Sequence, residues 1–147
     1  VDPSNLPNLL SSLGLTENNT AEAAVLPQVN ADAKEFSLTL SVVQSQSIMN
    51  FIVYGISSST IKLGQGERRA IIRDYMETVH RGDIIWSDIE RMTNGQIPIS
   101  RNLVIERSNV AIALPVFRRI FGHNPNFKNP TENLAWNTLL YRIRFPR

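Results

Sequence analysis

The sequence contains no cysteine, which excludes disulfide bonds and metal sites built from thiolates. It contains no run of roughly 18 apolar residues, the length that a membrane-spanning helix needs. It has two histidines, whereas a zinc site takes about three or four ligands, and neither histidine belongs to an HxxxH or HExxH motif. We therefore expect no transmembrane helix, no metal ion and no other cofactor.

Sequence motifs of common enzymes are missing as well. No GxSxG, Walker A or GxGxxG motif occurs, and the nearest segment, LGQGER at residues 63–68, lacks the lysine and the third glycine. His80 and His123 each follow a predicted helix, where the helix dipole favours a cation, and neither is predicted to act in catalysis. The carboxylates of residues 67–77 are interspersed with arginines, which predicts a solvent-exposed face of ion pairs. We therefore expect no enzymatic activity.

The composition is that of an ordinary globular protein. The chain has 147 residues, of which 42% are hydrophobic and 19% charged, and this fits one domain with a proper core. The first residue is Val1 and not a methionine, which suggests a processed chain. Residues 1–36 contain five acids and one lysine, a net charge of −4, so the rest of the chain carries +6. Such a charge split often marks a surface that binds a partner.

Residues 1–31 are predicted to form an N-terminal arm outside a helical domain of residues 32–147. Prolines and asparagines are frequent in this segment, and its leucines are spaced for one short helix that ends at Gly14. Four exposed leucines are unfavourable in water, so we expect them to pack on this domain or on another subunit. These predicted partner-binding residues of the arm are Leu6, Leu9, Leu10 and Leu13. A glycosylation sequon lies in the same arm, at residues 18–20.

A helix is predicted over residues 33–54. Asp32 and Glu35 have the spacing of a capping box at its start, and Gly55 is a typical residue for its end. The competing prediction is a strand over residues 36–42, where apolar and polar residues alternate.

Two helical hairpins are predicted after this helix, over residues 67–95 and 101–145. The first joins a helix that Gly82 ends to a helix that Asp83 caps and that ends before Pro98. The predicted fold is therefore all-α, an irregular bundle of helical-hairpin units with an extended N-terminal arm.

The second hairpin contains the longest predicted helix, from Ser100 to Phe121. Apolar residues occur on more than one side of it, which predicts a central, buried helix, and Pro115 is expected to kink or split it. The loop of residues 122–129 begins with a glycine and ends in an Asn-Pro helix-start signal, so it is interpreted as a connector. Phe127 in this loop is expected to fold back on the helix pair as a plug.

The two hairpins are similar to each other in sequence. Aligning Tyr75 with Phe117 places a tryptophan, Trp86 or Trp136, in the second helix of each unit. Units this short bury their apolar faces by stacking, so both tryptophans are predicted to face inward.

Two segments carry a resemblance to a known kind of module. They are FRRIFG at residues 117–122, followed by Trp136 and Leu139, and NFIVYG at residues 50–55, followed by LGQGER. In these motifs, residues 48–145 resemble short helical modules of long secreted surface and S-layer-like proteins of bacteria. The resemblance implies an extracellular module of cell-surface architecture, and it implies no catalytic residue.

Basic residues concentrate at the C-terminal end of the chain. The predicted basic patch consists of Arg118, Arg119, Arg142, Arg144 and Arg147. Its candidate partners are other copies of this chain, other surface proteins or acidic glycans. We therefore predict a noncatalytic structural or interaction module that self-associates, with the acidic arm of one copy on the basic patch of the next. Such a head-to-tail contact gives filaments or arrays if it does not close on itself.

Two other functions remain as alternatives. A basic helix-turn-helix that binds nucleic acid would use residues 86–92, a turn at residues 93–98, and Arg101 and Arg107 on the following helix. That helix is apolar nearly all round, which is unfavourable for reading a DNA groove. Carbohydrate binding would require that one of the two tryptophans be exposed. The Arg-Gly-Asp tripeptide of residues 81–83 is interpreted as a helix stop and cap.

Overall fold

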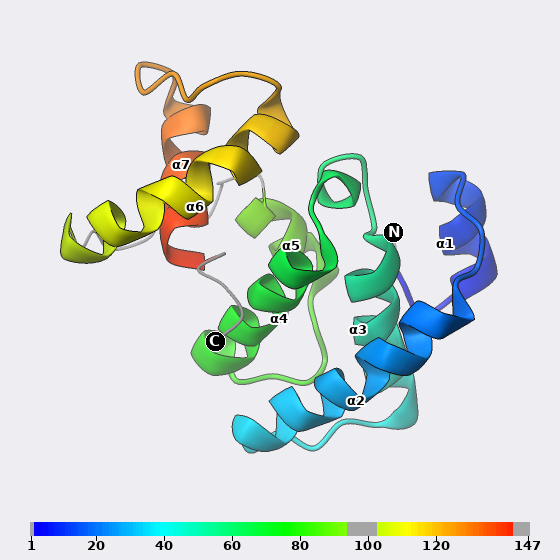
Figure 1. Cartoon of the computed structure of the whole chain (residues 1–147). Helices are drawn as coiled ribbons and strands as arrows, with labels where there is room; N and C mark the ends of the chain where they lie inside the picture. The colour runs from blue at the N-terminus through cyan, green and yellow to red at the C-terminus, as the bar shows by residue number, and fades with distance from the viewer. Residues whose placement is uncertain (1, 94–102, 143–147) are drawn as a thin grey trace.

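The computed structural model describes residues 2–93 and 103–142. Within these ranges the chain forms seven α-helices and one short 3-10 helix, with no strand, which confirms the all-α class (Figure 1). The helices are α1 (Leu6–Leu13), α2 (Asn19–Glu35), α3 (Val42–Tyr54), α4 (Gln65–Val79), α5 (Trp86–Thr93), α6 (Leu103–Phe121) and α7 (Pro130–Arg142), and the 3-10 helix η1 is Thr60–Lys62.

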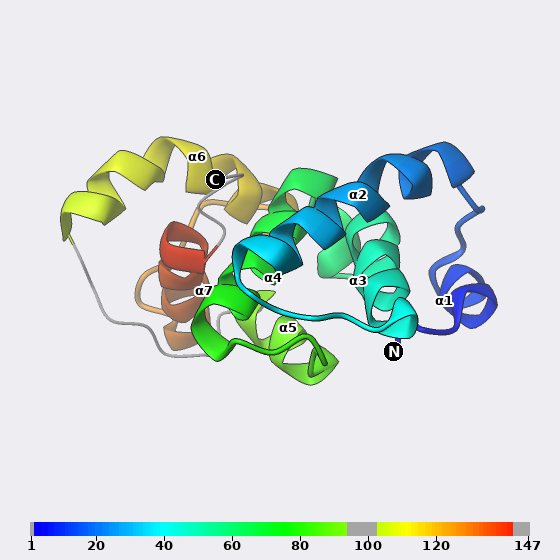
Figure 2. The same ribbon diagram turned by 90° about the horizontal axis from the view of Figure 1, so that it is seen from below.

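The helices are arranged from one end of the molecule to the other in roughly chain order. Helices α1 to α3 form one end, α6 and α7 form the other, and α4 and α5 lie between them (Figures 1 and 2). Helix α2 packs on α3, α4 packs on α3, α5 and α7, and α6 packs on α7. The apolar core runs through all three parts, with Phe51, Tyr75 and Phe117 among its largest buried side chains. In the ranges that the structure describes, no helix is both long and apolar enough to cross a membrane.

The N-terminal segment is helical over most of its length. Helix α1 ends at Gly14, whose φ of 66° is left-handed, so the short helix is confirmed. The rest of the predicted arm is wrong, because residues 19–35 form α2. Val25, Val29 and Ala33 recur every four residues and bury one narrow stripe of this helix. The helix continues through Pro27, and the Asn18 side chain accepts a hydrogen bond from the Ala21 N–H as its cap.

The start of α2 is tied to the end of α3 by a tyrosine. The Tyr54 hydroxyl accepts a hydrogen bond from the Asn18 N–H at 2.8 Å and donates one to the Glu22 carboxylate. Burial, supported by Glu22, raises the pKa of Tyr54 from 10.0 to about 12.

This raised pKa predicts a loss of stability at alkaline pH. The folded chain holds the Tyr54 proton more tightly than the unfolded chain, so this contribution is complete below pH 10 and is lost as pH rises toward about 12. Chemical denaturation of the unaltered chain and of Tyr54→Phe, between pH 10 and about 12, measures this contribution to the free energy of unfolding. We expect the stability difference between the two chains to narrow as pH rises, and a constant difference would contradict the assignment.

The helix predicted over residues 33–54 is interrupted. Residues 36–41 connect α2 to α3 and form neither helix nor strand, so the competing strand over residues 36–42 is wrong as well. The capping box of α3 lies later than predicted: the Ser41 hydroxyl accepts from the Gln44 N–H, and the Gln44 side chain accepts from the Ser41 N–H. Gly55, with a φ of 80°, ends α3 as predicted.

The helix pairs of the two predicted hairpins exist, but several of their end signals differ. Helix α4 ends at Val79 and not at the predicted Gly82, and His80 follows it in the left-handed conformation. Gly82 instead allows a close approach, since a Cβ atom there would lie 2.5 Å from a methyl group of Leu40. Asp83 does not cap α5, which begins three residues later. The predicted signals Gly95, Pro98 and Ser100 lie outside the described residues.

Helix α6 is continuous through Pro115 and is not split there. One side of it is buried against the rest of the chain through Ala113, Phe117 and Ile120. The prediction of a central, buried helix is wrong, because α6 lies at one end of the molecule (Figure 1) and residues on its other side are exposed. Three apolar residues of this helix are exposed: Val104 by 77%, Val110 by 39% and Ile112 by 46%.

Candidate interaction surface

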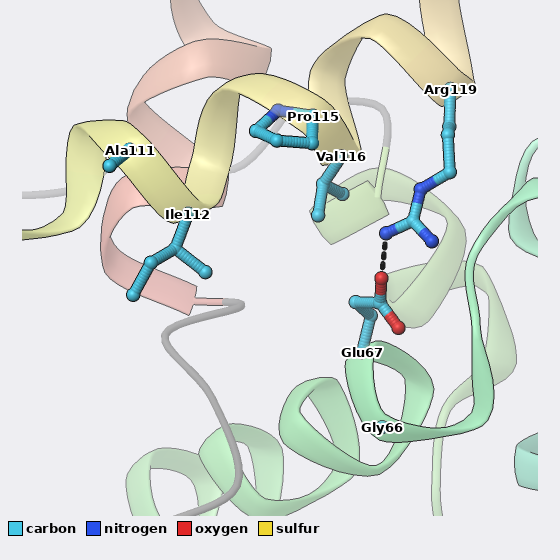
Figure 3. Close-up of a pocket in the computed structure, with 7 residues that line it drawn as sticks. All are labelled: Gly66, Glu67, Ala111, Ile112, Pro115, Val116 and Arg119. Carbon is cyan, nitrogen blue, oxygen red and sulfur yellow. Dashed lines mark ion pairs between the residues drawn. The ribbon is translucent and has the colours of Figure 1, made fainter.

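A mostly apolar hollow lies between α6 and the start of α4. It has a volume of about 500 Å³, and we call it the α6 groove (Figure 3). Its walls are mostly apolar, and a single ion pair, between Arg119 and Glu67, crosses one end of it. The groove is lined by Gly66, Glu67, Ala111, Ile112, Pro115, Val116 and Arg119.

The spacing of residues along α6 explains why the groove is apolar. Ala111, Ile112, Pro115 and Arg119 follow one another at intervals of one, three and four residues, so they share one face of the helix. Arg119 lies in the last turn of α6 and Glu67 in the first turn of α4, where the helix dipoles favour these charges. The pair is half-exposed and adds little stability, so its main effect is to fix the end of the groove.

The described part of the predicted basic patch lies beside this groove. Arg118 is exposed and donates a hydrogen bond to the Asn124 side chain at 2.6 Å. Lys62 was missed by sequence reasoning, and its ammonium group donates to the Ile120 carbonyl oxygen at 3.1 Å, at the end of α6. Arg144, Arg147 and the side chain of Arg142 lie outside the described residues, so a patch of five arginines stays a prediction.

The leucines of α1 pack on the chain's own core. Leu9 is 0% exposed, and Leu6, Leu10 and Leu13 pack around the core cluster, which is the first of the two predicted alternatives. The exposed apolar residues of this half were missed: Val42 is 72% exposed and Val43 is 62% exposed, in the first turn of α3. We call these two residues the valine pair.

Two acids near the end of α2 are paired with arginines of α4. Asp32 is 2% exposed and accepts two hydrogen bonds from Arg69, each of 2.8 Å. Arg73, also buried, pairs with both Asp32 and Glu35. The predicted solvent-exposed face of ion pairs is therefore wrong, because these arginines of α4 hold the last turn of α2. Hydrogen bonding to Asp32 raises the pKa of Arg69.

Another arginine of α4, Arg68, is buried and pairs with no carboxylate among the residues that the structure describes. Arg68 is 5% exposed and donates hydrogen bonds to four backbone carbonyl oxygens, and burial lowers its pKa to about 10. Two of these oxygens, of Ile52 and Val53, belong to the last turn of α3, where helix carbonyls lack helical partners. The other two belong to Thr60 and Leu63, in the loop before α4.

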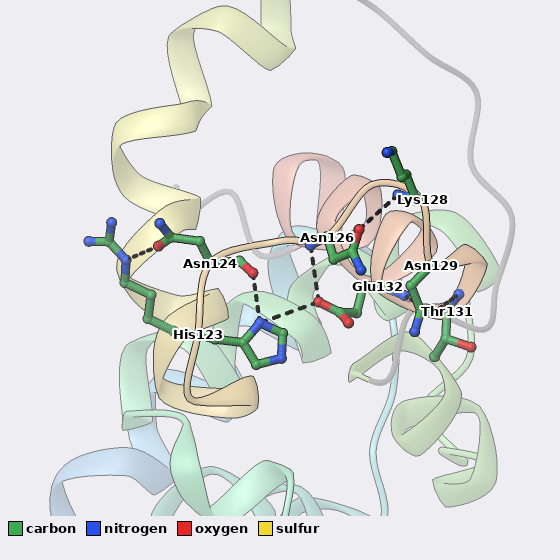
Figure 4. Close-up of polar contacts among 8 residues, drawn as sticks. His123, Asn124, Asn126, Lys128, Asn129, Thr131 and Glu132 are labelled. Atoms are coloured by element: carbon green, nitrogen blue, oxygen red, sulfur yellow. Dashed lines mark hydrogen bonds and ion pairs between the residues drawn. The ribbon is translucent and has the colours of Figure 1, made fainter.

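The loop of residues 122–129 is a connector built from polar contacts (Figure 4). Gly122 ends α6 with a φ of 78°, and the Asn129 side chain caps α7 by accepting from the Thr131 and Glu132 N–H groups. The Glu132 carboxylate does not close a capping box but accepts from the Asn126 N–H at 3.1 Å. Phe127 folds back on α7, since its ring packs edge-to-face with that of Trp136 at 6.0 Å between centres, but it is 59% exposed and so does not plug the helix pair.

The two tryptophans differ in burial. Trp136 is 8% exposed and packs on Phe117 with the ring centres 6.1 Å apart, as predicted. Trp86 is only partly buried: its ring contacts Phe51 at 5.4 Å and also lines two surface depressions. The prediction that both rings face inward is therefore wrong for Trp86.

The two histidines and the charged ends of the Arg-Gly-Asp tripeptide are all exposed. His80 and His123 are both exposed, and His123 Nδ1 lies 2.7 Å from the Asn124 carbonyl oxygen. Over residues 2–93 and 103–142, no three histidine or acidic side chains gather as they would around a metal ion. Arg81 and Asp83, of the Arg-Gly-Asp tripeptide, form an exposed ion pair with each other.

Comparisons with protein-family models, with curated proteins and with solved structures found no match. The resemblance to bacterial surface modules therefore stays a prediction from the motifs.

Proposed function

We propose that the protein is a noncatalytic interaction module that joins copies of itself head to tail. In this proposal the valine pair of one copy enters the α6 groove of the next. The observation that carries the proposal is the exposed apolar face of α6, because apolar residues beside an apolar hollow are typical of a binding surface. The motif resemblance adds the setting, an extracellular surface assembly, as part of the same proposal.

The two surfaces are complementary in shape and in charge. The valine pair projects from the first turn of α3, whereas the α6 groove is hollow and apolar. Asp2 and Asp83 lie beside Val43, around one depression. Arg118 and Arg119 lie at the groove end of α6. Asp83 and Arg119 are already paired within the chain, with Arg81 and Glu67, so Asp2 beside the projection and Arg118 beside the groove are the charges that favour this pairing over groove-to-groove contact.

The surfaces lie on different parts of the chain, so the contact leaves both ends of a dimer open. A heterologous contact of this kind extends into a filament unless the rotation closes a ring. Burying two valines contributes about 1.5–3 kcal/mol each, and the loss of free motion on association offsets much of this. We therefore expect weak association that strengthens as the protein concentration rises.

Removing either surface should abolish assembly. Val43→Asp places an acid in the projection, and Ile112→Asp places one in the groove. We expect both variants to be monomeric in sedimentation experiments. The unaltered chain should increase in mass with concentration. Val79→Asp is the matched control, because Val79 is 45% exposed but lies in neither surface.

Mixing the two monomeric variants distinguishes this geometry from a symmetric dimer. The Val43→Asp variant keeps its groove and the Ile112→Asp variant keeps its valine pair, so one contact forms between them and growth then stops. We expect a dimer containing one of each variant. A symmetric interface would leave the mixture monomeric. The proposal would also fail if the unaltered chain stayed monomeric at about 1 mM, because a binding free energy of about −4 kcal/mol already gives association at that concentration.

A further inference from the structure

We propose that Trp86 forms the platform of a binding site for a neutral glycan. Its ring separates two shallow depressions, with volumes of about 470 Å³ and 220 Å³, and Asp2 lines both of them. Phe51 lies against the inner side of the ring and fixes its position. This inference goes beyond head-to-tail assembly, since it assigns a glycan to the surface around the start of α5. The smaller depression is also lined by Val43 of the valine pair, whereas the larger one is not.

The Trp86 ring provides a flat apolar surface on which the carbon-bound hydrogens of a sugar can pack. A pyranose with equatorial hydroxyl groups has two flat, weakly apolar faces, and an aromatic ring with a polar edge packs well against such a face. Trp86 is the first residue of α5 and is partly exposed, whereas Trp136 is enclosed by the core. The chain thus keeps one of its two tryptophans at the surface beside polar groups.

The polar groups on both sides of the ring suit hydroxyl groups, which donate and accept at once. The larger depression has Ser87, Glu90 and Arg91 beside the ring, and the smaller has Ser4, Gln44 and Asp83. Asp2 accepts one hydrogen bond, from the Ser4 N–H, and Glu90 accepts a long one of 3.4 Å from Ser59. A carboxylate accepts about four hydrogen bonds, so both retain capacity for a ligand.

The charges decide which glycans fit. Asp2 and Glu90 flank the ring, so an acidic glycan would meet like charge. An organic cation is the main rival ligand, because cations bind aromatic faces beside carboxylates. Cation sites usually surround the ligand with several aromatic rings, whereas here the lining has one ring and the cation Arg91. A neutral sugar fits this mixed set of donors and acceptors better.

Tryptophan fluorescence tests the site, because the chain has two tryptophans and only Trp86 lies at the surface among the described residues. The probes are cellohexaose and chitohexaose as neutral glycans, hyaluronan as an acidic glycan and tetramethylammonium as a cation. We expect a saturable change with at least one neutral hexasaccharide. Trp136→Phe should keep this change, and Trp86→Ala should abolish it.

Two further variants keep the test independent of folding defects. Glu90→Gln and Asp2→Asn retain the ring, and each should weaken neutral-glycan binding by about tenfold, the effect of losing one charged hydrogen bond. Ser58→Ala, on an exposed residue outside both depressions, is the control. No response to either hexasaccharide, or a response confined to tetramethylammonium or to hyaluronan, would overturn the inference.

Discussion

Replacing Arg68 by leucine is expected to lower the free energy of unfolding by about 2–4 kcal/mol. The side chain is 5% exposed and is the hydrogen-bond donor to four carbonyl oxygens. Leucine fills much of the same space but donates nothing. Each buried polar group that loses its partner costs about 1–3 kcal/mol, and water reaching part of the loop reduces the total.

Chemical denaturation of matched variants separates the hydrogen bonds from the charge. Arg68→Lys retains a cation but lacks the planar guanidinium that reaches several oxygens, so we expect it to recover only part of the loss. Arg91→Leu is the control, since Arg91 is exposed and its replacement should change stability by less than about 0.5 kcal/mol. Equal losses at positions 68 and 91 would show that the carbonyl contacts contribute nothing.

Replacing Asp32 by leucine is expected to cost about 3–5 kcal/mol. The carboxylate is 2% exposed and accepts from Arg69 and Arg73. Removing it leaves the buried Arg73 with the more exposed Glu35 as its acidic partner, and a buried charge that loses its partner is strongly destabilising. Thermal or chemical unfolding measures this loss.

Glu35 provides the internal comparison for this prediction. It pairs with the same Arg73, but its side chain is 55% exposed, so Glu35→Ala should cost less than about 1 kcal/mol. Restoring an apolar surround, by combining Asp32→Leu with Arg73→Met, should recover stability relative to Asp32→Leu alone. A double variant that is less stable than the single one would mean that the aliphatic packing of Arg73 matters more than its charge.

The sequence predicted the elements whose signals are local. Gly14 and Gly55 end their helices because each takes a positive φ, of 66° and 80°, which glycine adopts readily. The start of α7 was predicted because Asn129 caps it with its own side chain. Helical spacing predicts one apolar face of α4. Four of its five residues are buried and Val79 is 45% exposed; the buried four are Ile71, Ile72, Tyr75 and Met76.

The errors arose where one pattern serves two structures. Asp32 and Glu35 have capping-box spacing, but the Asp32 carboxylate accepts hydrogen bonds from two arginines of α4, thirty-seven and forty-one positions later in the chain. Helix α2 was missed because the segment is rich in prolines and asparagines, which favour loops, and only a narrow stripe of apolar residues marks the helix. The exposed face of α6 could not be predicted, because hydrophobic spacing identifies apolar residues but not which of them a neighbouring helix covers. Trp86 escaped prediction for the same reason.

The four contacts of Arg68 have a consequence for the surface loop between α3 and α4. The outer residues Ser58 and Ile61 are exposed, while the backbone beneath them is fixed from inside by a side chain of the following helix. The loop therefore takes its shape from its backbone and from α4, and not from its outward-facing side chains. We therefore expect substitutions at those positions to leave the loop conformation unchanged, and a sequence grafted there to be held on a fixed backbone.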